Sequence, residues 1–306
     1  MPEGDTIFRT AASIRTWLGG RVITGARSSL PHIGVGRLVG RTVSSVDTVG
    51  KNLLLTFAAT NPGETDLVLH THMKMTGSWH VYPHGARWQR PLRQARVILE
   101  AGERVAVCFN APVVELASAE QTQRRGALAS AGPDILVLPL DLVGIRQRVA
   151  RTGPDLALGE LLLDQRLVAG IGNIYRCESL FLEGHHPWTP RRTLNDAGLD
   201  ALVVTASALM RANLGDAGAA TQFGREFGGG PNRPWVYRRA GLPCRRCATT
   251  IASKPQGEQA RVAYWCPTCQ TPRPPGSSVV SMSSTVSAVS VSSAVAAASG
   301  PPGPSV

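Results

Sequence analysis

The spacing of hydrophobic residues in the first twenty positions predicts one helix. The residues that recur at helical spacing are Ile7, Ala11, Ile14 and Leu18. Asp5 or Thr6 can cap this helix, and Gly19-Gly20 ends it. From Arg21 onward the pattern changes to short β-rich runs separated by turn residues. The strands expected from these runs are residues 21–23, 42–49, 52–57, 66–72, 77–81, 96–99, 105–109 and 113–116. We therefore expect residues 1–120 to form a β-sandwich or barrel with one long helix.

A polar stretch, residues 121–131, is expected to be a linker to a second part with helical periodicity. Within residues 132–240, one apolar face is marked by Leu156, Gly159, Leu163 and Leu167. That face is interrupted at residues 169–173, and a new helix follows from Ile174. A further apolar periodicity covers residues 194–214. This part is expected to be a helical domain with a glycine-rich turn between two of its helices.

Four of the six cysteines form two C-x2-C pairs, Cys244 with Cys247 and Cys266 with Cys269, separated by eighteen residues. This spacing is typical of a zinc site. Four thiolates complete a tetrahedron and leave no open position, so one structural Zn²⁺ is expected to fold a hairpin over residues 241–271. The alternative is a disulfide framework, which needs an oxidising compartment.

The charge balance favours a polyanionic partner. The 306-residue chain has a formal net charge of +11 and a pI near 10.1, and its basic residues are almost all arginine. The planar guanidinium binds phosphate with two hydrogen bonds and keeps its charge. A general arginine bias would account for much of this charge without any nucleic acid.

The compartment is inferred from what the sequence lacks. The first residues do not join a basic region to an apolar run, so no signal peptide is expected. No stretch of about eighteen unbroken apolar residues exists, so no membrane span is expected. A reducing cytoplasm fits both observations and the thiolate site, with nucleoid association if the source is bacterial. Residues 272–306 are rich in Pro, Ser, Val and Ala, and are expected to be a disordered tail.

Pro2 and Glu3 offer a chemistry that composition does not reveal. Removal of Met1 would leave a secondary amine on Pro2, and an α-amino group with a pKa of about 7.7–8.0 is partly unprotonated near neutral pH. Such an amine can attack an aldehyde-like carbon and form an iminium, and Glu3 beside it could shuttle protons. The alternative is that Pro2 is an ordinary start of translation.

Three further residues are candidate phosphate contacts. Asn173 opens a predicted helix, whose free N–H groups favour an anion, although simple N-capping explains it equally well. Arg261 lies between the cysteine pairs, where a rigid hairpin would hold it firmly. Lys51 follows Gly50 at a turn into a strand and is one of only three lysines. A solvated surface charge is the alternative for both basic residues.

Four separated motifs, in order, give the chain a resemblance to the formamidopyrimidine-DNA glycosylase / endonuclease VIII (Fpg/Nei) family of base-excision repair enzymes. Pro2-Glu3-Gly4 resembles the processed N-terminus of that family. The other three motifs are residues 50–54 (GKNLL), residues 162–175 (LLDQ through GIGNIY, the helix–two-turn–helix element) and Arg261 with residues 264–270 (YWCPTCQ, the zinc finger). The match covers residues 2 to about 270.

The resemblance implies roles for the candidates. Pro2 would be the nucleophile that attacks C1′ of the damaged nucleotide, and Glu3 the general acid/base. The resemblance implies that Lys51 is both a catalytic residue and a phosphate contact beside the lesion. Asn173 and Arg261 would be further phosphate contacts. The damaged base would be expelled and the strand nicked by β- and δ-elimination. Met75 falls where the family inserts a side chain into the gap left by the flipped base, and a buried core methionine is the alternative.

Two departures from the formamidopyrimidine branch favour the endonuclease VIII branch, whose usual substrates are oxidised pyrimidines. They are the opening Gly4-Asp5-Thr6 and the segment of residues 108–116, which replaces a void-filling loop. The prediction is an α+β multidomain protein with an N-terminal β-sandwich, a helix–two-turn–helix domain and a zinc hairpin. It would act on damaged double-stranded DNA as a monomer. The rivals are an oxidised-purine glycosylase and a non-catalytic protein that only binds the lesion.

Overall fold

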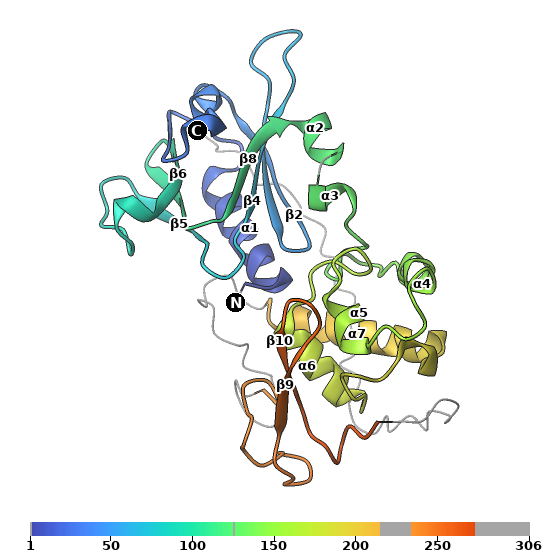
Figure 1. Ribbon diagram of the computed structural model, residues 1–306. Helices are drawn as coiled ribbons and strands as arrows, with labels where there is room; N and C mark the ends of the chain where they lie inside the picture. Colours follow the sequence, from blue (N-terminus) through green and yellow to red (C-terminus); the bar gives the residue numbers. More distant parts are fainter. Residues whose placement is uncertain (1, 125, 215–233, 273–306) are drawn as a thin grey trace, which may run out of the picture.

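A computed structural model describes residues 2–124, 126–214 and 234–272 of the chain. The expected tail, residues 272–306, lies outside the described residues except for its first position. Figure 1 shows two parts, one with the β-sheets and α1, the other with the remaining long helices and the β9–β10 hairpin, and the N-terminus lies where the two parts meet.

The N-terminal part is built from α1 (Gly4–Leu18) and two antiparallel four-stranded sheets. One sheet has the order β1-β6-β7-β5, with β1 (Gly25–Ser28), β6 (Ala95–Ala101), β7 (Arg104–Phe109) and β5 (Ser78–Pro83). The other has the order β2-β3-β4-β8, with β2 (Val43–Val49), β3 (Asn52–Phe57), β4 (Leu67–His72) and β8 (Val113–Ser118). Short 3₁₀ turns, η1 (Pro31–Ile33), η2 (Val35–Leu38) and η3 (Leu92–Gln94), connect the strands.

One core joins α1 to both sheets. The four residues predicted to share a face of α1 are all at most 1% exposed, and they pack with strand residues such as Leu55 and Leu99. Because α1 is covered on this face by both sheets, its first turn is held in a fixed place. The expected N-cap at Asp5 or Thr6 is wrong: the helix begins at Gly4, and Glu3 is the flanking residue. Asp5 does not cap α1 because its carboxylate, like that of Glu3, is hydrogen-bonded to the helical part instead.

Seven of the eight expected strands are present, with ends shifted by up to a few residues. Residues 21–23 form only an isolated bridge, Val22 with Thr42. The strand that was not expected is β1, whose burial pattern shows no alternation that would mark it in the sequence. The expected linker, residues 121–131, contains two short helices. They are most of α2 (Ala119–Arg124) and all of α3 (Gly126–Ala129).

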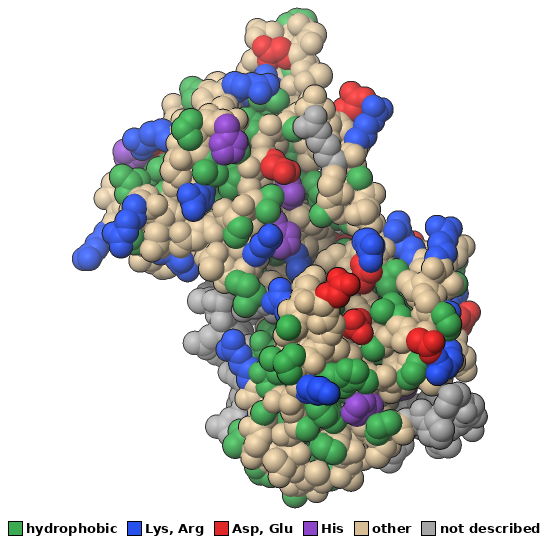
Figure 2. Space-filling view, viewed as in Figure 1, with side chains coloured by type: hydrophobic (Ala, Val, Ile, Leu, Met, Phe, Trp, Pro, Cys, Tyr) green, Lys and Arg blue, Asp and Glu red, His purple; other side chains and the backbone are tan. Residues whose placement is uncertain are grey.

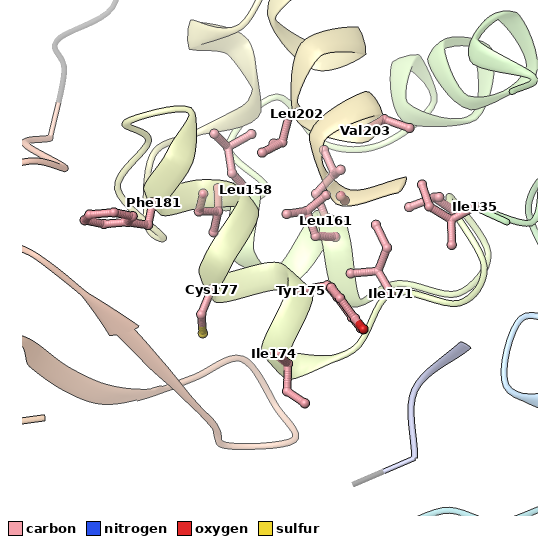
Figure 3. Packing of buried hydrophobic residues seen from close by; sticks show 14 of the residues in the cluster. Ile135, Leu158, Leu161, Ile171, Ile174, Tyr175, Cys177, Phe181, Leu202 and Val203 are labelled. Atoms are coloured by element: carbon pink, nitrogen blue, oxygen red, sulfur yellow. The ribbon is translucent and has the colours of Figure 1, made fainter. Parts of the chain in front are cut away.

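The helical part packs four helices around an apolar core. They are α4 (Leu142–Ala150), α5 (Leu158–Leu163), α6 (Asn173–Leu182) and α7 (Asp196–Ala212), with η4 (Arg191–Thr193) before the last. Figure 3 shows Leu161 and Leu202 within this core, while Tyr175 lies at its edge with the hydroxyl pointing away. The apolar face expected across residues 156–167 ends early, because α5 stops at Leu163 and a compact turn leads to α6.

The hairpin of β9 (Ala252–Gln256) and β10 (Arg261–Trp265) is anchored on α6 through buried polar groups. The Arg176 guanidinium is 0% exposed and donates to Gln256 Oε1 at 3.2 Å and to the Arg261 carbonyl at 3.3 Å. Gln256 Nε2 in turn donates to the Pro187 carbonyl at 2.8 Å. Burying such groups is stabilising only when they are hydrogen-bonded, so these bonds fix the hairpin to the helix. Among the described helices, none combines the length and apolar character needed to cross a bilayer.

Candidate active site

Pro2 lines a cavity of about 400 Å³ that lies between the two parts. The walls come from both parts: Asp5 from α1, Met75 from the β4–β5 turn, Trp79 from β5 and Tyr175 from α6. The volume is within the usual range of small-molecule sites. The predicted nucleophile therefore stands beside a space that accommodates one small molecule or one base.

The Glu3 carboxylate lies against the N-terminus of α6. Only 1% of Glu3 is exposed; its Oε1 accepts from the Ile174 N–H at 2.9 Å and its Oε2 from the Tyr175 N–H at 3.5 Å. Burial raises the pKa of Glu3 to about 7, although Lys51 and the two amides oppose this rise. A carboxyl group with this pKa is partly protonated at neutral pH and can both give and accept a proton.

The glycines around Glu3 make this approach possible. A Cβ on Gly172 would lie 2.2 Å from Glu3 Cδ, so only glycine leaves room for the carboxylate at this helix start. Gly170 has a φ of 107°, a backbone conformation that favours glycine, and its carbonyl accepts from the Gly4 N–H at 3.0 Å. The predicted glycine-rich turn thus serves to receive the chain's N-terminus.

Lys51 reaches the same turn from the β2–β3 connection. Its Nζ donates to the Ile171 carbonyl at 2.5 Å, and Gly50 beside it has a φ of 58°. Burial lowers the pKa of Lys51 to about 8, and the nearby Glu3 carboxylate opposes this shift. The two groups therefore lie near enough to influence each other, and both titrate close to neutral pH.

Two residues that sequence reasoning did not select hold this arrangement in place. Asp134 Oδ2 accepts from the Gly50 N–H at 2.7 Å and thereby fixes the β2–β3 turn. Gln165 Nε2 donates to the Ile171 carbonyl at 3.0 Å, and its Oε1 accepts from the Gly170 N–H at 3.0 Å. Gln165 lies within the LLDQ segment of the third motif, which was the one signal in the sequence. Asp134 had no such signal, because it acts on a residue 84 positions away.

A buried polar group next to Pro2 was also missed. Asp5, 3% exposed, accepts a hydrogen bond from Asn213 Nδ2 and lies 3.7 Å from the Arg9 guanidinium. Asn213 Nδ2 also lies 3.1 Å from the Tyr175 hydroxyl. Burial is the largest cause that raises the pKa of this hydroxyl, and the nearby Asp5 carboxylate raises it further. These contacts join α1 to α6 and to the end of α7, beside the cavity.

Met75 and Arg261 meet across the junction. Met75 is 56% exposed, so the alternative of a buried core methionine is wrong; Met73, 2% exposed, fills that role. The Arg261 guanidinium donates to Met75 Sδ at 3.4 Å, which brings the hairpin tip to the β4–β5 turn. Pro2, Glu3 and Lys51 lie close by on the same junction.

Asn173 is placed differently from either sequence-based interpretation. It is the first residue of α6 and 7% exposed, while Gly172 occupies the N-cap position, so the N-capping role is wrong. Its Nδ2 donates to the Val262 carbonyl at 2.9 Å, and its Oδ1 is buried without a hydrogen-bond partner within the described residues. The anion at this helix start is the Glu3 carboxylate. Asn173 therefore links α6 to β10, and a phosphate contact through its side chain stays a prediction.

The four paired cysteines come together at the base of the hairpin. Their Sγ atoms all lie within 4.8 Å of one another. Separations of 3.9 Å between Cys244 and Cys269, and of 3.4 Å between Cys247 and Cys266, are close to the roughly 3.8 Å expected for a tetrahedron with metal–sulfur bonds of about 2.3 Å. All six cysteines are described and none is in a disulfide. The donor set fits a metal ion, and the disulfide alternative is wrong.

Comparison with known proteins identifies the family. The family model described as formamidopyrimidine-DNA glycosylase N-terminal domain matches residues 1–112, and the model of the H2TH domain matches residues 132–224. A Streptomyces coelicolor protein described as probable endonuclease 8 2 is 38% identical over 286 residues, covering 92% of this chain and 99% of that protein. The chain belongs to the Fpg/Nei family. A DNA-(apurinic or apyrimidinic site) lyase Nei2 from Mycolicibacterium smegmatis is 35% identical, over 89% of this chain and 99% of that protein.

Solved structures show that the fold is that of the Fpg/Nei family. A complex of Lactococcus lactis Fpg with DNA containing an abasic site superposes with a TM-score of 0.71 at 19% identity, covering 88% of this chain and all of that one. The endonuclease 8 names of the relatives place this Fpg/Nei chain in the endonuclease VIII-like branch. The α+β architecture predicted from the sequence is confirmed.

Proposed function

We propose that the chain is a bifunctional DNA glycosylase/AP lyase of base-excision repair that removes oxidised pyrimidines through an iminium on Pro2. The observation that carries this proposal is the position of Pro2 on a cavity of about 400 Å³, with the carboxyl group of the next residue, Glu3, buried. Family membership and relatives described as endonuclease 8 and as a DNA-(apurinic or apyrimidinic site) lyase support glycosylase/AP lyase activity on damaged double-stranded DNA.

The chemistry follows from these groups. The target nucleotide leaves the stack, which costs least for a damaged base, and exposes C1′. The Pro2 nitrogen lone pair forms a bond to C1′, the C1′–base bond breaks, and its electron pair leaves with the base. The N–H proton of Pro2 then passes to the departing base. Protonation of the sugar ring oxygen by Glu3 opens the ring and leaves the iminium. Loss of a C2′ proton then expels the 3′ phosphate, a second elimination expels the 5′ phosphate, and hydrolysis restores the amine.

Lys51, Asn173 and Arg261 are proposed to hold the phosphates on either side of the flipped nucleotide, and Met75 to fill its place in the duplex. Phosphate contacts of this kind fix the register of the DNA and carry no sequence information. The exposure of Met75 and its contact with Arg261 support the wedge, because the side chain projects from the junction next to a guanidinium.

Two features support oxidised pyrimidines over oxidised purines as the substrate class. Only residues 110–112 connect β7 to β8, so this connection is too short to be a void-filling loop. The α1 opening carries Asp5 and Thr6 on the cavity wall, in place of the proline and glutamate of the formamidopyrimidine branch.

Borohydride trapping tests the function. Duplexes carrying an abasic site, an oxidised pyrimidine or 8-oxoguanine are incubated with the enzyme and reduced, which converts an iminium into a stable crosslink. We expect crosslinks with all lesions that are excised and the fastest trapping with the oxidised pyrimidine. Preferential trapping with 8-oxoguanine would support the purine rival. Binding without a crosslink on any duplex would make the protein a lesion-binding clamp.

The cysteine cluster is proposed to hold one structural Zn²⁺. Four thiolates saturate the ion, so it supplies no catalysis and instead stabilises the hairpin that carries Arg261. The protein is proposed to act as a monomer, because both sides of the junction come from one chain.

Cys247→Ala tests the zinc assignment. We expect affinity for lesion DNA to fall at least about tenfold, since the hairpin loses its metal-dependent fold, whereas the separate apolar core around α1 keeps its melting transition. The measurements are zinc content, fluorescence anisotropy and thermal melting of the holoprotein and the variant. Cys177→Ser, at a buried cysteine outside the cluster, is the control and should retain zinc. Unchanged DNA affinity in Cys247→Ala would contradict the role of the hairpin.

A further inference from the structure

A second and larger cavity lies on the N-terminal part, and the proposed chemistry does not use it. Its volume is about 760 Å³, and its walls come from β1, from β6 and from the connection between β5 and β6. Its lining includes three arginines, Arg27, Arg90 and Arg93, and the apolar side chains of Trp88 and Leu92. We call residues 84–94 the arginine loop.

The two cavities adjoin each other. Arg90 is half-buried and lines both the large cavity and the cavity beside Pro2, so the two cavities share this residue. Burial, and after it the positive charge of Arg90, lower the pKa of His80 on the wall of the Pro2 cavity. The arginine loop therefore borders the cavity in which Pro2 lies.

The positive charges of this loop are available to a ligand. Across residues 2–124, 126–214 and 234–272, neither Arg90 nor Arg93 forms an ion pair or a side-chain hydrogen bond. Arg27 differs, because Glu100 Oε1 lies 2.6 Å from its guanidinium. In Figure 2, basic side chains and no acidic ones gather at the left edge of the upper part, where Figure 1 places the β5–β6 connection.

The loop is held rigidly, although it lies on the surface. The Trp88 ring stacks on Tyr82 with a distance of 6.2 Å between ring centroids. It also makes an edge-to-face contact with Phe109, with the centroids 6.0 Å apart. The Gln89 N–H donates to the Tyr82 hydroxyl at 3.2 Å. A guanidinium on a fixed backbone loses less freedom on binding than one on a mobile loop, which favours a specific contact.

The loop is also connected to the proposed DNA wedge. Gln94, at its end, accepts from the Asn110 backbone N–H at 2.9 Å and from Asn110 Nδ2 at 3.1 Å. The Asn110 carbonyl accepts from the Thr76 hydroxyl at 3.1 Å, and Thr76 follows Met75 directly. The arginine loop and the Met75 turn thus form one hydrogen-bonded surface.

We propose that Arg90 and Arg93 bind backbone phosphates of the DNA strand that continues beyond the flipped nucleotide, so that this loop extends the DNA-binding surface outside the lesion. The inference rests on the proposed function, because it needs DNA at the junction. Phosphate is favoured over other partners because the guanidinium fork matches its oxygens, and the adjoining cavity is the one proposed to take the nucleotide. Such contacts act on any sequence and add to affinity through counterion release.

Arg93→Ala is the test, since Arg93 lines only the large cavity. Affinity is measured by anisotropy against salt on a long duplex of about 30 base pairs with a central abasic-site analogue, and on two duplexes shortened on one side of the lesion. One lost phosphate contact lowers the salt-dependence slope by about one and the affinity at 0.1 M salt by about five- to tenfold. We expect this loss on the long duplex and on only one of the shortened ones, with excision from the other unchanged.

Arg87→Ala is the matched control, because Arg87 is exposed on the same loop but lines neither cavity. It should change affinity by less than about twofold. Arg93→Glu should weaken binding more than Arg93→Ala. Equal effects of the Arg87 and Arg93 variants, or an Arg93→Ala loss that is the same on all three duplexes, would overturn the inference. A wild-type protein that binds none of the duplexes would instead overturn the proposed function.

Discussion

Inserting one glycine between Met1 and Pro2 will abolish base excision and strand nicking while DNA affinity changes by less than about tenfold. The insertion converts the Pro2 nitrogen into an amide, whose lone pair is delocalised and cannot attack C1′. The phosphate contacts proposed for Lys51 and Arg261 remain in place, so binding survives. Loss of a nucleophile in other enzymes costs about 10³-fold or more, and we expect at least this loss in single-turnover excision.

The decisive measurement is the identity of the crosslinked peptide. After borohydride reduction of the unmodified protein on abasic-site DNA, mass spectrometry should place the label on Pro2. Pro2→Gly replaces the secondary amine with a primary amine at the same position, and it should retain a reduced rate and a labelled N-terminus. A label on Lys51 or Lys74 would preserve the lyase but assign its nucleophile to a side chain.

Glu3→Gln will lower the excision rate by about 10²- to 10⁴-fold and will remove the alkaline limb of its pH profile. With a pKa of about 7, Glu3 loses its proton as pH rises through neutrality, and the rate falls above that value if it acts as the acid. The Pro2 amine, with an ordinary pKa of about 7.7–8.0, becomes protonated as pH falls below this range. We therefore expect a narrow bell-shaped profile for the wild type, with its maximum near pH 7.5, and a profile with only the acidic limb for the variant.

Glu3→Gln should raise the stability of the folded protein at alkaline pH although it lowers the excision rate. A lower rate in this variant would therefore not be caused by unfolding. Burial raises the pKa of Glu3 from 4.5 in the unfolded chain to about 7 in the folded one. The unfolded state therefore releases its proton first as pH rises, and the folded state loses stability between these two values. Glutamine stays neutral, and its single side-chain oxygen can still accept the shorter of the two hydrogen bonds, the one from the Ile174 N–H at 2.9 Å. The variant should match the wild type in urea unfolding at pH 4 and exceed it at pH 8.

A Glu3→Asp variant is the matched comparison. It keeps the carboxyl group but shortens its reach toward the α6 N-terminus, so it should recover a pH-dependent rate without full activity. An unchanged alkaline limb in Glu3→Gln would show that another group is the acid. A variant less stable than the wild type at pH 8 would show that the buried carboxylate is stabilised in the folded protein by its neighbours, Lys51 above all.

Much of the fold could be predicted from residues that are near each other in the chain. The periodicity that buries Ile7 and Leu18 on one face of α1 was visible, and so were most strands, because each pattern lies within a single helix or strand. The cysteine spacing likewise predicted the cluster that the structure brings together. β1 was missed because its four residues carry no alternation of burial.

The site was only partly predictable, since its geometry depends on contacts between distant segments. The sequence by itself determined which residues carry reactive groups: the secondary amine of Pro2, the carboxyl group of Glu3 and four thiolate donors. Only the tertiary structure decided that Glu3 points into the α6 N-terminus, 171 positions away, and that Asn173 holds the hairpin instead of capping its helix. The physical reason is that hydrophobic periodicity and metal-ligand spacing are local properties, whereas burial shifts a pKa and selects hydrogen-bond partners only after the two parts of the chain have packed together.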